Sequence, residues 1–342
     1  MPATKGIPAS MRAAAFLGDG RVEVRECPIP ELGAGMVLIR VSACALCGTD
    51  RHGFEHGSAV VPGHEIAGAV VLCGPQADID IGTEGVVYLV EFCGDCFACR
   101  NGSTNMCLNR RAMYGLTVPG GFAEYVTVRA DCFLPVASSF SPSRATTLLD
   151  LFGTTRHALL RYGTDVPRCL AVVGCGPIGL GAVAVGQAMG IERIYASDVA
   201  PYRLELAAGL GAVTIDASLV NTVEQLHTME TDGCDVVIEA AGLSHTQRQA
   251  IAMAAPGGRV MIVAHSRGTL ELQTSTDLIR REISLVGCEY FPIGEFGGTH
   301  ALVTDGGLDP DPILTHSFPL EGLKEACDSF FSGTTGKVVI HP

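Results

Sequence analysis

The feature that most constrains the fold of this chain is a glycine-rich turn directly after an apolar strand. Residues 172–179 read V-V-G-C-G-P-I-G, which has the spacing G-x-G-x-x-G and opens a helix. Glycines with this spacing allow a tight turn, a close approach of backbone to a pyrophosphate, and close packing of helix on strand. The turn predicts a dinucleotide site, the alternative being an ordinary glycine-rich turn. Its expected binding residues are Gly174, Gly176, Pro177, Ile178 and Gly179.

The chain around this turn alternates between strand-like and helix-like patterns. Strand-like runs occur at Leu170–Val173, Ile194–Ala196, Val213–Ile215, Val236–Glu239, Arg259–Val263 and Ile283–Val286. Helix-like patterns separate them at Gly179–Met189, Arg203–Leu210 and near His245–Ala255. This alternation predicts an α/β fold with a doubly wound parallel sheet of the Rossmann type. The residues before it, with strand-like runs at Val37–Ser42, Ile66–Leu72 and Glu84–Val90, predict a separate β-rich region.

An acidic residue at the end of the second strand indicates which dinucleotide is bound. Asp198 follows the second glycine by roughly twenty residues, where a carboxylate accepts hydrogen bonds from the adenosine ribose. Because a carboxylate repels a 2′-phosphate, this position favours NAD over NADP. Arg203 either contacts the same ribose or lies on a solvated helix face.

A quartet of cysteines lies within the β-rich region. Cys93, Cys96, Cys99 and Cys107 have the spacing C-x2-C-x2-C-x7-C. Four thiolates this close can enclose one zinc ion in a tetrahedron with no open position, which is typical of a structural site. An iron–sulfur cluster fits less well, because the bacterial ferredoxin pattern ends in C-x3-C-P. Four unligated thiols are the remaining alternative.

Composition excludes several classes of protein. With 23 Lys+Arg against 36 Asp+Glu, the net charge is −13, so nucleic acid is not an expected partner. No apolar run approaches the roughly 20 residues that cross a bilayer, and Met1–Ser10 lacks the apolar core of a secretory signal. Fourteen cysteines without an export signal predict a reducing, cytoplasmic environment. Cysteines in apolar or glycine-rich runs are expected to be small buried side chains, among them Cys44, Cys175 and Cys288.

Two short segments complete a resemblance to a known family. Residues 47–52 read C-G-T-D-R-H and residues 63–65 read G-H-E; with Gly120–Tyr125 and Gly336–Val339 they stand in the same order as in zinc-dependent medium-chain alcohol dehydrogenases. The chain resembles this family from Met11 to Pro342. The resemblance implies a GroES-like catalytic domain with a structural zinc lobe at 11–152, a Rossmann NAD-binding domain at 153–292, and a return to the catalytic domain at 293–342.

The resemblance also implies a catalytic zinc bound by Cys47 and His64. A catalytic zinc has three protein ligands and one open position. In the family the third ligand precedes the cofactor domain, which points to Asp150, the alternative being an N-cap for the following helix. The polyol branch usually has Glu-Pro here, whereas Asp150 followed by His157 is similar to the bacterial secondary-alcohol branch.

Further roles follow from the same resemblance. Glu65 matches a glutamate behind the metal that can coordinate it transiently. Asp50 is expected to accept a hydrogen bond from the free ring nitrogen of His64, unless it is a surface turn carboxylate. Thr49 matches a hydroxyl that hydrogen-bonds the substrate oxygen, and His52 matches the histidine that passes the proton to solvent. His52 is otherwise an exposed loop histidine, and His56 is a nearby competitor.

These features predict a zinc-dependent oxidoreductase that transfers a hydride from a small secondary alcohol or polyol to NAD, giving the ketone or aldehyde. Arg51 and Arg156 are expected at the surface or facing the cofactor, the alternative being recognition of a polar or anionic substrate. Two alternatives are a cyclase or lyase with a recycled nicotinamide, and a non-catalytic nucleotide-sensing protein. The resemblance implies a homodimer or homotetramer formed through the Rossmann sheet edge, which the apolar run Ile283–Val286 with Cys288–Pro292 is expected to supply.

Overall fold

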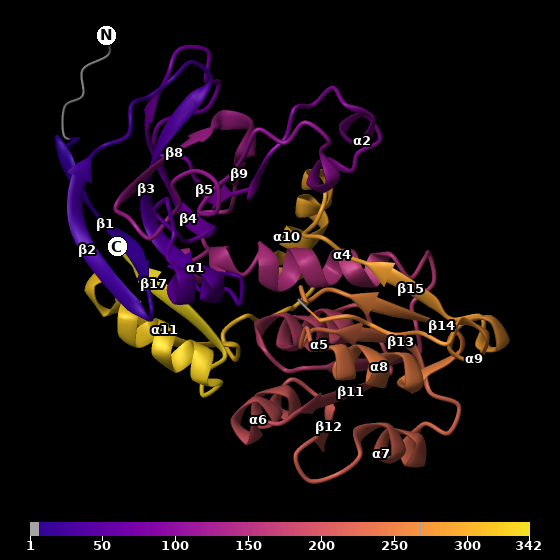
Figure 1. The fold of residues 1–342 in the computed structure, drawn as a ribbon. Helices are drawn as coiled ribbons and strands as arrows, with labels where there is room; N and C mark the ends of the chain where they lie inside the picture. Colours follow the sequence, from indigo (N-terminus) through magenta and orange to yellow (C-terminus); the bar gives the residue numbers. More distant parts are fainter. Residues whose placement is uncertain (1–6, 267) are drawn as a thin grey trace. The chain divides into compact units, whose positions relative to one another are not determined.

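The computed structural model describes residues 7–266 and 268–342, which divide into two compact units. The first unit contains the described residues up to Leu149 together with Leu314–Pro342, and the second contains Asp150–Ile313. The chain therefore contributes to the first unit twice, as the indigo and yellow ends of the ribbon in Figure 1 show. Within these stretches, no helix combines the length and the apolar character needed to span a membrane.

The second unit is built on a parallel sheet. Its strands are β10 (Cys169–Val173), β11 (Arg193–Asp198), β12 (Val213–Asp216), β13 (Cys234–Glu239), β14 (Ala254–Ile262) and β15 (Ser284–Gly287). They are arranged in the order β12-β11-β10-β13-β14-β15. This is the 3-2-1-4-5-6 order of a Rossmann sheet, so the predicted doubly wound fold is confirmed. The order reverses between β10 and β13, which is where ligands bind in such sheets.

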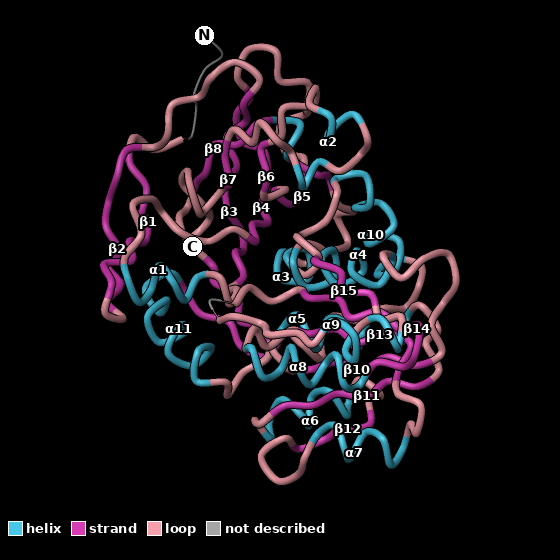
Figure 2. Tube along the Cα trace, turned by 45° about the vertical axis from the view of Figure 1, so that its right-hand side comes forward, coloured by secondary structure: helices cyan, strands magenta, loops and turns pink. Residues whose placement is uncertain are grey.

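Helices cover both faces of this sheet (Figures 1 and 2). They are α4 (Thr155–Leu160), α5 (Pro177–Ala188), α6 (Pro201–Gly209), α7 (Thr222–Met229), α8 (Ser244–Met253), α9 (Thr274–Asp277) and α10 (Phe296–Thr304). One apolar cluster joins α5 and α6 to the sheet, and another joins α7 and α8. Small residues bring α5 close: a Cβ at Gly186 would lie 3.0 Å from side-chain atoms of Leu170 and Ile194.

The first unit is β-rich, as predicted. Its strands are β1 (Ser10–Gly18), β2 (Arg21–Pro28), β3 (Met36–Ala45), β4 (Glu65–Cys73), β5 (Glu84–Val87), β6 (Val90–Glu91), β7 (Ala112–Met113), β8 (Tyr125–Arg129), β9 (Phe133–Pro135), β16 (Leu314–Pro319) and β17 (Lys337–His341). Strands β1 and β2 form a hairpin, β6 and β7 form a short ribbon, and the others form one sheet in the order β16-β17-β3-β4-β5-β9, with β8 paired to β3. The C-terminal strand β17 therefore lies inside this sheet, between β16 and β3.

Short helices connect these strands. They are α1 (Asp50–His56), α2 (Phe97–Arg100), α3 (Pro142–Thr146) and α11 (Leu323–Ser332). The sequence did not predict α1, whose only buried apolar side chain is Phe54. The strand expected over Glu84–Val90 ends at Val87, and a separate strand begins at Val90. A change of partner accompanies the break: Val86 and Val87 pair with β9, and Tyr88 N–H still donates to the Cys132 carbonyl at 2.7 Å, whereas Val90 pairs with Met113 of β7.

Candidate functional site

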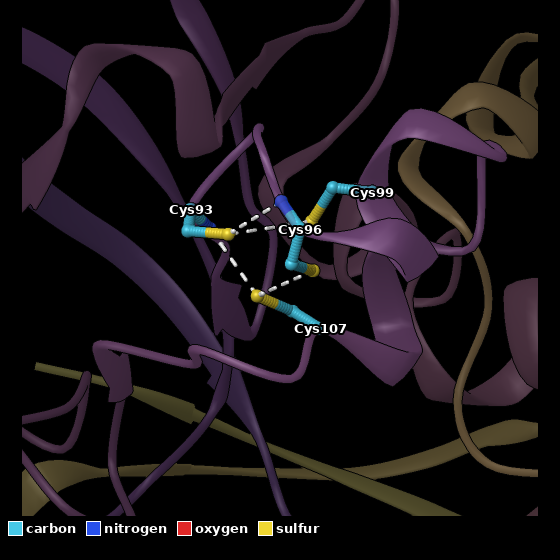
Figure 3. A group of neighbouring side chains, drawn as sticks. All are labelled: Cys93, Cys96, Cys99 and Cys107. Atoms are coloured by element: carbon cyan, nitrogen blue, oxygen red, sulfur yellow. Dashed lines mark hydrogen bonds between the residues drawn. The ribbon is translucent and has the colours of Figure 1, made fainter.

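Four cysteines gather in the segment that joins β6 to β7. One sulfur from each of Cys93, Cys96, Cys99 and Cys107 lies within 4.8 Å of the others, and Figure 3 shows the side chains turned toward one another. The Sγ atoms are 3.9 Å apart for Cys93 and Cys99 and 4.0 Å apart for Cys96 and Cys107. Zinc–sulfur bonds of about 2.3 Å place the sulfurs of a tetrahedral site about 3.8 Å apart. This four-cysteine lobe, residues 93–107, therefore fits one closed zinc site.

Backbone amides around the lobe favour thiolates. Cys93 N–H donates to Cys107 Sγ and Cys96 N–H donates to Cys93 Sγ, both at 3.3 Å. Backbone N–H groups of Cys99 and Leu108 lower the pKa of Cys96 to about 6, whereas burial raises the pKa of Cys99 to about 12. Four neighbouring thiolates repel one another, so all four form together only around a cation.

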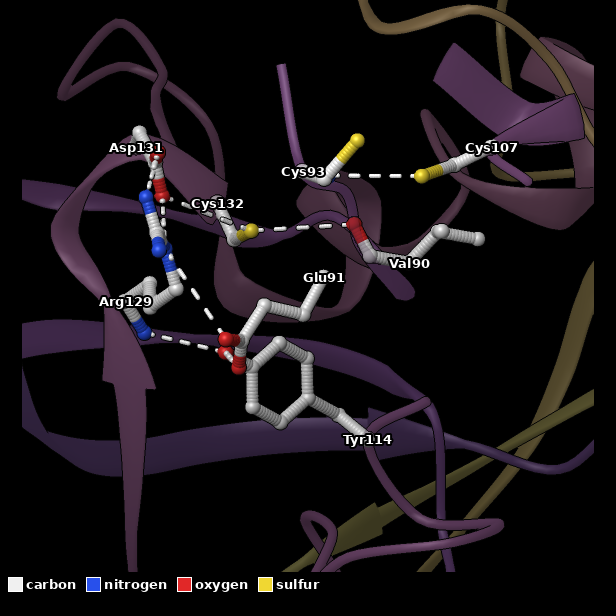
Figure 4. Close-up of polar contacts among 8 residues, drawn as sticks. All are labelled: Val90, Glu91, Cys93, Cys107, Tyr114, Arg129, Asp131 and Cys132. Carbon is white, nitrogen blue, oxygen red and sulfur yellow. Dashed lines mark hydrogen bonds and ion pairs between the residues drawn. The ribbon is translucent and has the colours of Figure 1, made fainter. Parts of the chain in front are cut away.

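A polar network supports the base of the lobe (Figure 4). Tyr114 Oη donates to Glu91 Oε2 at 3.0 Å and accepts from Arg129 N–H at 3.0 Å. The Arg129 guanidinium is hydrogen-bonded to Asp131, and Cys132 Sγ lies 3.7 Å from a carbonyl of β6. These bonds tie the β6–β7 ribbon, from which the lobe projects, to β8 and the segment after it.

A second cluster of metal-binding side chains forms where β3 ends and β4 begins. Cys47 follows β3, His64 immediately precedes β4, and the two strands are paired antiparallel. One ligand atom from each of Cys47, His64, Glu65 and Asp150 lies within 4.8 Å of the others. Thiolate, imidazole and carboxylate are the ligands of catalytic zinc sites. The donor set of these four side chains therefore fits a zinc ion.

A glycine allows His64 to reach this position. Gly63 has φ +94, and a Cβ there would lie 2.8 Å from both Cys44 Sγ and the ring of Phe122. Positive φ and the absence of space both exclude a larger residue. The turn at Gly63 thus sets where the imidazole of His64 points.

Asp150 is bonded directly to Leu149, the residue at which the first unit ends. It begins a π-helical turn, Asp150–Thr154, that runs into α4. The hydroxyl of Thr155 donates to the Leu151 carbonyl at 2.7 Å, and such side-chain bonds distort the regular helical ladder. The residue at the N-cap of α4 is Thr154, so the capping role that was the alternative for Asp150 is wrong.

Asp50 lies beside both Cys47 and His64 and is buried. Its Oδ2 accepts a hydrogen bond from Cys47 N–H at 2.9 Å, and its Oδ1 lies 3.6 Å from His64 Nδ1. That separation is longer than a hydrogen bond but keeps the carboxylate facing the ring nitrogen. Thr49 Oγ1 lies 3.7 Å from Cys47 Sγ. The surface turn that was the alternative for Asp50 does not occur.

The motifs gave no indication of a buried ion pair at Glu65. The Nζ of Lys337 in β17 contacts Glu65 Oε1, and the two side chains are 1% and 0% exposed. Their separation of 272 positions hides the pairing from any local pattern. The available signal was a lone lysine at the start of an apolar C-terminal strand.

Outside this cluster, α1 presents polar side chains at the surface. His52 and His56 are both exposed, and their ring centroids are 4.8 Å apart. The Arg51 guanidinium lies 4.6 Å from the centroid of the Phe331 ring and donates to the Phe331 carbonyl at 2.9 Å. Arg51 is therefore a surface residue held against the C-terminal helix, as we favoured over substrate recognition.

The glycine-rich turn joins β10 to α5 as predicted. Gly174 has φ +93, and a Cβ at Gly179 would lie 1.8 Å from the Gly174 carbonyl oxygen. Pro177 and Ile178 occupy the first turn of α5, where proline is favoured because its nitrogen needs no hydrogen-bond partner. The helix N-terminus, with its backbone N–H groups, is a site suited to phosphate.

Asp198, at the end of β11, is hydrogen-bonded to the backbone of this turn. Its Oδ2 accepts from Cys175 N–H at 2.6 Å and its Oδ1 accepts from Ala200 N–H at 2.8 Å. Arg203 lies close by, since its Nη1 is 4.0 Å from where a Gly176 Cβ would be. The predicted cofactor residues of the second unit are therefore assembled at the switch point of its sheet.

Two residues of α4 that the sequence singled out, Arg156 and His157, both contact Glu295 within the second unit. His157 Nδ1 lies 3.0 Å from Glu295 Oε1, and Arg156 Nη1 donates to the Glu295 carbonyl at 3.4 Å. These contacts fix α4 to the start of α10. Glu295 was not foreseen, because it lies 138 positions from His157.

Comparisons with known proteins agree with this architecture. Residues 33–138 match the family described as alcohol dehydrogenase GroES-like domain, and residues 177–304 match the zinc-binding dehydrogenase family. The chain is 31% identical over 329 residues to L-threonine 3-dehydrogenase of Bacillus subtilis, which covers 93% of this chain and 94% of that protein. It is 29% identical over 343 residues to sorbitol dehydrogenase of Bombyx mori, covering 96% and 98%.

A solved structure shows the same fold. The alcohol dehydrogenase TADH from Thermus sp. ATN1 superimposes with a TM-score of 0.90 at 30% identity, covering 97% of this chain and 100% of that one. The fold and the two clusters of metal-binding residues define a dehydrogenase that uses zinc and a nicotinamide dinucleotide. The chain belongs to the zinc-dependent medium-chain alcohol dehydrogenase family.

Membership confirms the predicted class of enzyme and its cofactors. The protein is a zinc-dependent oxidoreductase of alcohols or polyols, with zinc and NAD as cofactors. Its substrate is a small molecule. The names of the relatives give no support to the cyclase or lyase alternative.

Proposed function

We propose that this enzyme oxidises a small secondary alcohol or polyol to its ketone or aldehyde, with a catalytic zinc bound by Cys47, His64 and Asp150. The observation that carries this proposal is the convergence of a thiol, an imidazole and carboxylates within 4.8 Å. When bound, the zinc lowers the pKa of the substrate hydroxyl and NAD accepts the hydride. Relatives named for threonine and sorbitol support a small hydroxylated substrate.

The protein's own residues orient the site and move the proton. Asp50, anchored by Cys47 N–H, faces His64 Nδ1 and so leaves Nε2 as the metal ligand. Thr49, beside Cys47, accepts a hydrogen bond from the substrate hydroxyl; as it takes up that proton its own hydroxyl proton passes on, and the exposed His52 gives a proton to solvent. Lys337 holds Glu65 as a carboxylate beside the side chains that would hold the metal.

In the second unit, the turn from Gly174 to Gly179 binds the pyrophosphate of NAD, with Gly176, Pro177 and Ile178 lining it. Asp198 accepts from the ribose hydroxyls, for which its two oxygens retain lone pairs after binding two backbone amides. Arg203 borders the same ribose. Because Asp198 repels a 2′-phosphate, we expect NAD to give the higher kcat/KM when initial rates with NAD and NADP are compared.

We further propose a homodimer or homotetramer in the cytoplasm. The edge of the Rossmann sheet at β15 supports an oligomer. β15 is the last strand of the sheet, so a second copy of the chain can continue the sheet there. All fourteen cysteines lie in the described residues and none forms a disulfide, which supports a reducing compartment. Light scattering coupled to gel filtration measures the mass of the assembly.

The deciding experiment compares zinc content and activity in Asp150→Asn and wild type. We expect two zinc ions per chain in wild type, one in the variant, and a loss of at least about 100-fold in NADH formation on a panel of secondary alcohols and polyols. Asp165→Asn, at an exposed position, is the matched control and should keep both. One zinc in wild type, or an active Asp150→Asn enzyme, would exclude the proposed site.

A further inference from the structure

We propose that Cys169 and Cys234 form a dithiol that a peroxide oxidises reversibly to a disulfide between β10 and β13. Neither residue belongs to the zinc or dinucleotide sites described above. Their sulfurs lie 2.7 Å apart, well inside the roughly 3.5 to 4.0 Å at which non-bonded heavy atoms usually rest. The four-cysteine lobe, by contrast, holds its sulfurs 3.9 and 4.0 Å apart, as a shared metal requires.

The backbone brings these two thiols together from neighbouring strands. β10 and β13 are paired in parallel with Leu170 opposite Val236, so Cys169 and Cys234 are the first residues of adjacent strands. Both thiols belong to the same apolar cluster and so point to the same face of the sheet. By this register Cys169 lies opposite Asp235, the neighbour of Cys234, and Asp235 Oδ2 accepts from Cys169 N–H at 3.1 Å. The strand ends are thus fixed, and a sulfur–sulfur bond needs little movement of the backbone.

Both thiols are buried close to the surface. Cys169 is 2% and Cys234 0% exposed, but Arg168 and Asp232 nearby are exposed, so a small oxidant needs only local opening of the strand ends. The hydrogen bond with Cys169, together with burial, raises the pKa of the Cys234 thiol. Cys169 is the more exposed of the two sulfurs, so we place the first attack there.

The reaction balances with hydrogen peroxide as the oxidant. The Cys169 sulfur attacks one peroxide oxygen, the O–O bond breaks, and water leaves with the thiol proton, giving a sulfenic acid. The Cys234 sulfur then attacks the Cys169 sulfur, the S–O bond breaks, and the hydroxyl leaves as water with the Cys234 proton. Two thiols lose two electrons in total, and the peroxide is reduced to two waters. A dithiol reductant reverses the change.

The position of the bond determines its effect. Cys169 and Cys234 lie at the amino ends of β10 and β13. The glycine-rich turn follows Val173 at the carboxyl end of β10, which is the opposite edge of a parallel sheet. The bond closes a segment of 65 positions, which restricts the unfolded chain far more than the folded one. We therefore expect oxidation to raise Tm by several degrees and to leave turnover unchanged.

Residue-resolved mass spectrometry of the zinc-loaded full chain tests this proposal. After peroxide treatment, alkylation and digestion without reductant, we expect a linked peptide pair containing Cys169 and Cys234, lighter than the two free peptides by two hydrogens. Dithiothreitol should abolish it. Cys169→Ser and Cys234→Ser should each remove both the linked pair and the rise in Tm, with Cys169→Ala and Cys234→Ala as second variants if serine is not tolerated.

Cys327→Ser is the matched control, because Cys327 is a buried thiol of α11 in the other unit and should leave both results intact. The proposal would be overturned if Cys169 and Cys234 were both still fully alkylated, and so still free thiols, at a peroxide dose that had already oxidised more exposed thiols. A link that forms only once zinc has been lost or the chain has unfolded would also overturn it.

Discussion

Among single residues, Lys337 makes the contact of greatest consequence for stability. Its ammonium and the Glu65 carboxylate are 1% and 0% exposed. Removing one partner of a buried pair leaves the other charge desolvated, which is costly. We expect Lys337→Met to lower the free energy of unfolding by about 3–5 kcal/mol in urea denaturation.

Lys324 provides the control at an exposed position. It pairs with Asp328 at 2.7 Å, but the side chains are 57% and 54% exposed, so Lys324→Met should cost less than about 1 kcal/mol. The double variant Glu65→Gln/Lys337→Met should recover much of the loss, because no carboxylate charge then stays buried. Equal effects of the two lysine substitutions would contradict this account of Lys337.

The residues that sequence patterns could nominate are those in short contiguous motifs. Cys47 and His64 stand in such motifs, and the structure brings them together with Asp150, a residue nominated only by resemblance. Lys337 and Glu295 lacked any such signal, since each contacts a partner far away in the sequence. Long-range polar pairs depend on how strands and helices assemble, and no local spacing encodes that.

At the scale of elements, the turn from β10 into α5 depends on the absence of side chains. A Cβ at Gly179 would lie 1.8 Å from the Gly174 carbonyl oxygen, so Gly179→Ala must displace the turn. We expect NADH to bind at least about tenfold more weakly, as measured by isothermal titration calorimetry. Gly209→Ala, where a Cβ meets open space at the end of α6, should bind NADH normally and gain up to about 1 kcal/mol in stability. Unchanged NADH affinity in Gly179→Ala would contradict this role.

The starts of β10 and α5 were predicted to within two residues, whereas β14, expected from Arg259, begins at Ala254. β10 was expected from Leu170 and begins at Cys169, and α5 was expected from Gly179 and begins at Pro177. The π-helical turn at Asp150–Thr154 was not predicted; the Thr155 hydroxyl donates to the Leu151 carbonyl there, a contact that apolar periodicity does not encode. Short elements without an apolar face, such as α1, carry too little pattern to be recognised.

At the scale of the whole molecule, the two units differ in how the chain builds them. The second unit is one continuous segment, Asp150–Ile313, with its own sheet and its own apolar clusters. The first unit takes β16 and β17 from the C-terminus, and β17 lies inside its sheet with partners on both sides. A return of the chain to the first unit was expected from residue 293, and in the structure the first unit resumes at Leu314.

This difference predicts which part of the chain folds alone. A fragment of residues 150–313 should fold and bind NADH with a Kd within about tenfold of that of the full chain, because all strands of its sheet are present. A fragment of residues 7–149 should not fold, because β3 loses β17 as a neighbour and the buried face of the sheet is exposed. Joining residues 314–342 to Leu149 through a flexible linker should restore cooperative unfolding and one zinc per chain in the four-cysteine lobe. Circular dichroism, calorimetry and zinc analysis of the three fragments check these outcomes. Cooperative unfolding of 7–149 alone would show that β17 is dispensable for the first unit.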